Sequence, residues 1–167
     1  MDAFDGFPDF MATNGSALSR FAYLLVGNHA DAEDLLQSAL TKTAVHWRRV
    51  ARYDNPAAYV RQAMVNEIYG RWRRRRLLRM VSVTKVPERS SADAADASVD
   101  RLVVWRALDR LTPRQRAVLV LRFHEDLSVE ETAALLRCST GTVKSQTHAA
   151  LSRLREMAPE LADLRVS

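Results

Sequence analysis

The last third of the chain carries two short motifs that mark where helices begin. In TPRQ at 112–115 and SVEE at 128–131, a hydroxyl residue is followed three positions later by Gln or Glu. This spacing is the capping box, in which the two residues satisfy each other's free backbone N–H groups. A third helix start follows at Ser139 or Thr140, directly after a turn at Arg137. This order predicts a helix-turn-helix module, which lays its last helix in a DNA groove.

Composition favours helices and an anionic partner. The 167 residues include only five Gly and five Pro, and the formal net charge is +5. Few helix breakers favour an all-helical chain, and no strand or hairpin pattern interrupts it. A basic balance suggests a polyanionic partner. At this length we expect one medium domain or two small ones.

Cysteine usage and the first residues bear on the cellular compartment. Cys138 is the only cysteine, so no disulfide can form within the chain, which fits a reducing cytoplasm. The N-terminus, MDAFDGFPDF, lacks the basic start of a signal peptide, and no apolar run reaches membrane-spanning length. We expect a cytoplasmic protein without membrane insertion.

The first half of the chain predicts a small helical bundle. Residues 10–26 suit one helix with a weak point near Gly15, and Gly27 then breaks it. Residues 31–50 give the cleanest helix, whose apolar face ends at Trp47. The opposite face of this helix is polar, and taken alone it is expected to face solvent. It carries Asp34, Gln37, Ser38, Thr41 and Lys42.

A third helix is expected from Pro56, with Asn55 as its N-cap. Its apolar stripe closes with Trp72, which favours a core position for that side chain. The helix then runs into RWRRRRLLR, the densest charge in the chain. Cations interleaved with aromatic side chains suit single-stranded nucleic acid, although a charge run is more often a solvated face. The candidate contacts are Tyr59, Gln62, Asn66, Tyr69, Arg73 and Arg74.

Residues 81–100 are small, polar and acidic, with one proline. They lack the large apolar side chains that offset the entropy of ordering, which is typical of a flexible linker. The sequence therefore predicts an all-α fold. Two small helical domains, at 8–80 and 101–158, are joined by a flexible acidic linker at 81–100.

The helix from Thr140 is the candidate DNA reader. Val143, Ala150 and Leu151 are expected to face the core. Short donors and one cation are left outside, and they suit phosphates and base edges, the alternative being a solvated helix face. These residues are Thr142, Lys144, Ser145 and His148.

No catalytic constellation or metal-ligand spacing is present in the sequence. Glu130 and Glu131 resemble paired carboxylates, but helix capping explains them. There is no nucleophile elbow or glycine-rich phosphate loop, and the four His and Cys138 are scattered. We expect no enzymatic activity, no metal and no cofactor.

Four motifs in order make the chain resemble a known family. They are DAEDLLQSAL, DNPAAYVRQAMVNEIYGRWRRRR, LTPRQRAVLVLRFHEDLSVEETA and STGTVKSQTHAALSRLR. From Phe10 to about Met157 the chain resembles a small bacterial sigma factor of the extracytoplasmic-function type. This is group IV of the sigma-70 family, and the likeness is to its actinobacterial SigE-family branch.

The resemblance implies a promoter-specificity subunit of RNA polymerase. The polar face from Asp34 to Lys42 would then dock on the beta-prime clamp of the core enzyme. The helix from Pro56 would recognise and melt the minus-ten element, with Asn66 at a flipped base. The C-terminal domain would read the minus-thirty-five element and rest on the beta flap. Members of this family are commonly held inactive by an anti-sigma factor.

The sequence departs from the family pattern in two places. Arg137 stands where relatives usually carry Gly at the helix-turn-helix turn, and Ala149 where they often carry Arg. A residue other than Gly at a left-handed C-cap costs roughly 1 kcal/mol. These departures leave the minus-thirty-five preference open, as the sequence does for the target promoters, the inducing signal and any particular anti-sigma partner.

Two other functions remain open on the residues alone. A stand-alone helix-turn-helix transcriptional regulator would form a dimer and bind a palindromic duplex directly. A protein-interaction module would use its basic faces to bind an acidic partner.

Overall fold

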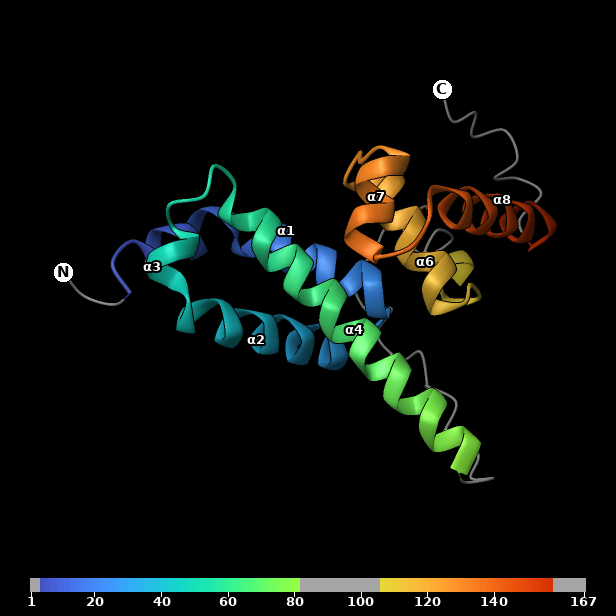
Figure 1. The fold of residues 1–167 in the computed structure, drawn as a ribbon, viewed down its shortest axis with the longest axis horizontal. Helices are drawn as coiled ribbons and strands as arrows, with labels where there is room; N and C mark the ends of the chain where they lie inside the picture. The colour runs from blue at the N-terminus through green and yellow to red at the C-terminus, as the bar shows by residue number, and fades with distance from the viewer. Residues whose placement is uncertain (1–3, 82–105, 158–167) are drawn as a thin grey trace. The chain divides into compact units, whose positions relative to one another are not determined.

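A computed structural model of the chain describes residues 4–81 and 106–157. Within these ranges every regular element is helical, and the chain forms two compact units, one mainly of α1 to α4 and one of α6 to α8 (Figure 1). This confirms the predicted all-α fold with two helical domains. The predicted linker lies almost entirely outside the described residues, so the domain boundaries stay a prediction. The elements are α1 (Phe7–Val26), α2 (His29–Val45), α3 (Trp47–Val50), α4 (Pro56–Val81), α6 (Pro113–Leu119), η1 (Val120–His124), α7 (Val129–Leu136) and α8 (Thr140–Met157).

The first unit is built around one apolar face of each long helix. Phe21 of α1, Leu35 of α2 and Met64 of α4 are fully buried. Burying each such side chain contributes about 1.5–3 kcal/mol. α2 packs along the first half of α4, whereas the last nine residues of α4, from Arg73 onward, are all exposed (Figure 1). The core thus fixes the first half of α4 and leaves its arginine-rich half in solvent.

The predicted helix over residues 31–50 is wrong in its continuity. The structure starts α2 earlier, at His29, because the Asn28 side chain caps it by accepting from Asp31 N at 2.8 Å. His46 leaves helical geometry at φ −113°, and α3 then begins at Trp47. No Gly or Pro marks this break in the sequence. Tertiary packing accompanies it: the Trp47 ring lies 5.0 Å from that of Phe7, and its Nε1 donates to Asp5 O at 2.8 Å.

The predicted weak point at Gly15 is also wrong, because α1 runs without interruption from Phe7 to Val26. Side chains on the preceding turn bond back to the helix, with Asn14 Nδ2 donating to Phe10 O at 3.0 Å. The helix also begins three residues before the predicted start, because Phe7 packs on Trp47. The predicted stop at Gly27 is confirmed, and its φ of +83° needs a glycine.

Both predicted capping boxes are present in the second unit. Thr112 Oγ1 accepts from Gln115 N at 3.2 Å, and Thr112 N donates to Gln115 Oε1 at 3.1 Å. Ser128 and Glu131 repeat the exchange at 3.0 and 2.7 Å. Each box satisfies donors that a helix start otherwise leaves free, and such a cap is worth about 1 kcal/mol.

The helix that starts at the first box does not stay regular up to the second. From Val120 to His124 it widens into a π-helix, in which Glu125 N donates to Val120 O at 3.0 Å. The Arg122 guanidinium then closes the loop by donating to Leu127 O. Such wide turns are rare and usually one turn long, as here.

Arg137 is left-handed, with φ 50° and ψ 47°, at the turn where the family pattern has Gly. Cys138 N donates to Ala133 O at 3.0 Å and Arg137 N to Ala134 O at 3.3 Å. These two bonds are the Schellman arrangement that ends many helices. The turn of the helix-turn-helix is therefore kept, with an arginine in a conformation that favours glycine.

Candidate nucleic-acid interface

The start of α8 presents a capped, polar end. Ser139 Oγ accepts from Thr142 N at 3.1 Å and lies 2.9 Å from Thr142 Oγ1. Lys144, Ser145 and His148 are exposed, whereas Thr142 is half-buried within the cap. A helix start carries a partial positive charge and free N–H groups that suit a phosphate. All four predicted residues therefore lie in the N-terminal half of α8, with Thr142 the least accessible.

The inner face of α8 holds this end in place. Val143 and Ala150 are fully buried, and Leu151 and Leu154 are partly buried, with both leucines packed on a core that includes Leu108, Leu119 and Ala150. Gly141 has only Ser139 Oγ near the position of an added Cβ, at 3.7 Å, so no close approach within the chain requires a glycine there. The start of α8 is thus fixed by its cap and its apolar face.

The predicted face of α4 combines amides, aromatic rings and cations. Gln62 Nε2 donates to Asn66 Oδ1 at 3.1 Å, and Asn66 is exposed. The half-buried Tyr59 has its ring 5.9 Å from that of Tyr53. Tyr53 is 41% exposed and was not identified as a candidate from the sequence, because it lies in the turn before α4 rather than on the helix.

The aromatic residues at the middle of α4 form a second pair. The rings of Tyr69 and Trp72 lie 4.8 Å apart at 70°, an edge-to-face geometry. Trp72 is half-buried, so the core position expected for it is only partly realised. Arg73 and Arg74 follow in solvent. The structure therefore places aromatic surface directly before the exposed arginines.

One carboxylate forms ion pairs with three cations where α2 packs against α4. Glu67 forms an ion pair with Lys42 of α2, and its Oε1 lies 3.4 Å from Arg71 Nε and 3.9 Å from Arg74 Nη2. The hydrogen bond from Lys42, followed by the nearby Lys42 and Arg71 charges, holds the pKa of Glu67 below its ordinary value despite partial burial. Glu67 was not identified from the sequence, although its spacing to Arg71 is that of a helical ion pair.

The polar face of α2 is accessible along most of its length. Asp34, Gln37 and Thr41 are exposed, and Ser38 is half-buried. Thr41 Oγ1 donates to Gln37 O at 2.8 Å. Lys42 is exposed but already engaged by Glu67. This face therefore presents short polar side chains and one cation, Lys42, whose charge Glu67 partly neutralises.

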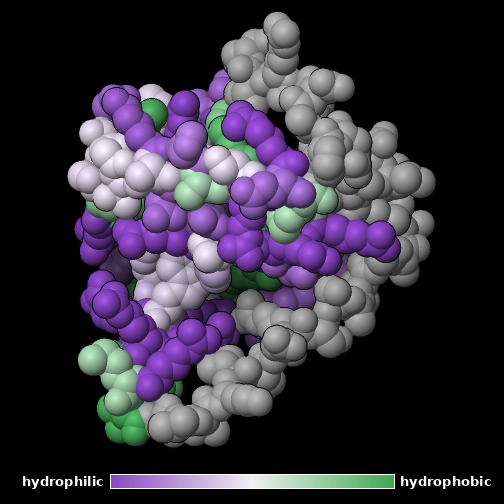
Figure 2. All heavy atoms as spheres, turned by 90° about the vertical axis from the view of Figure 1, so that its right-hand side faces the viewer, coloured by the Kyte–Doolittle hydropathy of each residue, from purple (hydrophilic) through white to green (hydrophobic). Residues whose placement is uncertain are grey.

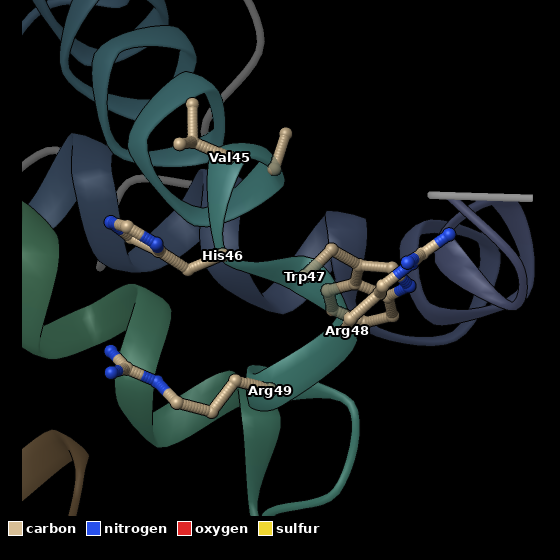
Figure 3. Close-up of a pocket in the computed structure, with 6 residues that line it drawn as sticks. Val45, His46, Trp47, Arg48 and Arg49 are labelled. Carbon is tan, nitrogen blue, oxygen red and sulfur yellow. The ribbon is translucent and has the colours of Figure 1, made fainter.

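The break between α2 and α3 forms an open hollow lined by residues 44–49 (Figure 3). His46, Arg48 and Arg49 contribute its charge and polarity, with Val45 exposed beside them. The lining holds no carboxylate or nucleophile. Across residues 4–81 and 106–157, no group of three or more His, Cys, Asp and Glu is arranged to hold a metal ion.

The far end of α4 mixes arginines with exposed apolar side chains. Leu77, Leu78, Met80 and Val81 are 58–87% exposed. Figure 2 shows hydrophobic atoms at its lower edge, where α4 ends, beside hydrophilic side chains. In the part of the chain that the structure describes, no helix is both long enough and apolar enough to span a membrane.

Comparison with known proteins identifies both units. Residues 10–78 match the family described as Sigma-70 region 2, and residues 107–156 match Sigma-70, region 4. The first match covers α2 and most of α4. The second covers the capped helices α6 and α7 together with most of α8.

Individual relatives agree with these matches over most of the chain. The RNA polymerase sigma-E factor of Streptomyces coelicolor is 43% identical, over 90% of this chain and 84% of its own length. The ECF RNA polymerase sigma factor SigL of Mycobacterium tuberculosis is 32% identical, over 91% and 88%. Among solved structures, the sigma factor RpoE of Bartonella quintana, in complex with the anti-sigma factor NepR, aligns with a TM-score of 0.69 at 29% identity. That alignment covers 92% of this chain and 96% of the other.

Two family matches in the expected order, and relatives spanning nearly the whole chain, decide between the functions that the residues alone left open. They do not favour a stand-alone regulator. The chain belongs to the extracytoplasmic-function sigma factors of the sigma-70 family, the subunits that bind core RNA polymerase and direct initiation at promoters.

Proposed function

We propose that the two units divide promoter recognition between binding the duplex and opening it. The observation that carries this division is the contrast between two exposed surfaces. The start of α8 offers a few ordered donors, and α4 offers aromatic rings followed by dense positive charge. Duplex reading needs a helix that fits the groove, whereas opening needs a surface that prefers unstacked bases.

In this proposal the start of α8 enters the major groove of the minus-thirty-five element. Lys144, Ser145 and His148 are exposed on it and can reach phosphates or base edges. Thr142 already bonds within the cap, so its proposed role is a phosphate contact through the helix start.

The exposed face of α4 is proposed to bind and open the minus-ten element. The Gln62–Asn66 bond orders two amides that can read a base edge. The rings of Tyr59 and Tyr69 can stack on bases, and Arg73 and Arg74 can neutralise the strand's phosphates.

The remaining faces are proposed to bind proteins. Asp34, Gln37, Ser38, Thr41 and Lys42 would contact the beta-prime clamp, and the C-terminal unit would rest on the beta flap. The domains are proposed at 8–80 and 101–158, with 81–100 as the linker. The similarity to a sigma factor solved with an anti-sigma factor supports a partner of that class here. We propose a cytoplasmic protein that is not itself an enzyme.

Run-off transcription with core RNA polymerase on genomic DNA of the host tests this function. The expected result is specific initiation that depends on both the chain and the core enzyme. The mapped start sites should then share two upstream elements. Direct binding of a palindromic duplex by a dimer of the chain, with no initiation in the presence of core enzyme, would contradict the proposal.

A further inference from the structure

We propose that Glu67 restrains the affinity of α4 for nucleic acid: its carboxylate holds the cations of Lys42, Arg71 and Arg74 and weakens sequence-independent binding to this helix. This inference rests on the proposed role of α4 in opening DNA. It adds a residue that contributes by reducing affinity rather than by contacting a base.

The geometry makes Glu67 a competitor of phosphate. The Glu67 side chain is only 14% exposed, whereas those of Lys42 and Arg74 are 59% and 69% exposed. A phosphate approaching from solvent therefore meets the cations before it meets the carboxylate. To neutralise Lys42 or Arg74 fully, that phosphate has to take the place of Glu67.

Charge explains how this competition sets the affinity. Three cations against one carboxylate leave the cluster basic, so it still attracts a strand. Sequence-independent affinity follows the number of phosphates neutralised, and Glu67 lowers that contribution for every strand alike. Contacts to bases through Tyr59 and Asn66 do not involve this cluster. Glu67 therefore lowers the affinity of α4 for nucleic acid without changing which bases it prefers.

Stabilisation of the fold is a smaller consequence of the cluster. Ion pairs with well-exposed partners contribute little to folding. One unit charge about 4 Å from a phosphate in water changes affinity by about fivefold. We therefore expect removal of the Glu67 charge to affect nucleic-acid binding more than folding.

The test measures the affinity of the full chain for single-stranded oligothymidylate by fluorescence anisotropy. Glu67→Gln should bind about fivefold more tightly than the wild type, with a salt slope steeper by about 0.7. Glu33→Gln is the matched control, because Glu33 is exposed on α2 outside the cluster and its substitution changes the net charge equally.

Unchanged or weaker binding by Glu67→Gln, or an equal gain in Glu33→Gln, would overturn the inference. Circular dichroism checks the fold of each variant, and Glu67→Met provides a second neutral side chain. If both Glu67 variants unfold, the residue serves the fold rather than nucleic-acid affinity, and the inference is wrong. Failure of the proposed function gives a different result, in which wild-type holoenzyme opens no promoter whatever the single-strand affinities are.

Discussion

The two helices proposed to touch DNA are ordered by different means. The start of α8 is fixed locally, by a Ser139 cap and by Val143 in the core one turn later. The arginine-rich half of α4 lies beyond the core, and the Glu67 ion pairs order only its beginning. Reading a duplex needs a few donors at fixed positions, whereas binding an opened strand needs charge density and rings that accept any base. The difference in construction matches the difference in proposed task.

The largest expected effect comes from removing a stacking ring on α4. Tyr59→Ala should make the opened complex on duplex promoters less stable by about 1–3 kcal/mol and so reduce initiation, because one base loses its aromatic partner. On templates whose minus-ten region is already unpaired, most of this loss should disappear. Run-off transcription by the holoenzyme on both templates measures it. An equal loss on the two templates would assign Tyr59 to binding rather than to opening.

Lys144→Ala on α8 should affect promoter binding rather than promoter opening. Loss of one phosphate-binding cation should weaken promoter binding by about 1 kcal/mol and lower the salt slope by about 0.9. The loss should be the same on duplex and pre-opened templates. Arg155→Ala, in the last turn of the same helix, is the control and should change neither quantity. A Lys144 effect confined to duplex templates would contradict the division between the two helices.

The turn before α8 gives a smaller, purely structural prediction. Arg137→Gly should raise the free energy of unfolding by about 1 kcal/mol, because glycine adopts φ 50° without steric cost. Arg153→Gly, at an exposed position inside α8, should lower it by a similar amount. Thermal unfolding of the full chain compares them. Destabilisation by both substitutions would show that Arg137 is not strained.

The smallest expected effect is a pH dependence of the first unit. The pKa of Glu67 in the folded chain lies below its ordinary value of 4.5, chiefly because Lys42 donates to the carboxylate. Its contribution to stability is therefore complete above pH 4.5 and is lost as the pH falls through the folded pKa. Thermal unfolding should show wild type and Glu67→Gln converging at acid pH. A constant difference across that range would argue against the ionised carboxylate as the cause.

Local chemistry explains what could be predicted from the sequence. The capping boxes at Thr112 and Ser128 and the stop at Gly27 depend on residues close together in the chain, and all are present as expected. The left-handed turn at Arg137 was indicated only by the family pattern, in which relatives carry Gly at that position. Family motifs then supplied the assignment of each unit, which spacing alone could not.

The missed features all depend on contacts between distant residues. The break at His46 accompanies the packing of Trp47 on Phe7, forty positions away. The π-turn after Val120 depends on how the loop to Leu127 closes. Glu67 was missed because its main partner, Lys42, lies on another helix. Periodicity places a residue on a face but does not say which side chain opposes it.

The division of labour between α8 and α4 is tested most directly by a fluorescent base analogue placed in the minus-ten element of a mapped promoter. Its signal reports strand opening as holoenzyme is titrated. Lys144→Ala should shift the titration to higher protein concentration and reach the same final signal as wild type. Tyr59→Ala should bind in the same concentration range and reach a lower final signal. If both variants change the same quantity, the two helices do not divide binding from opening.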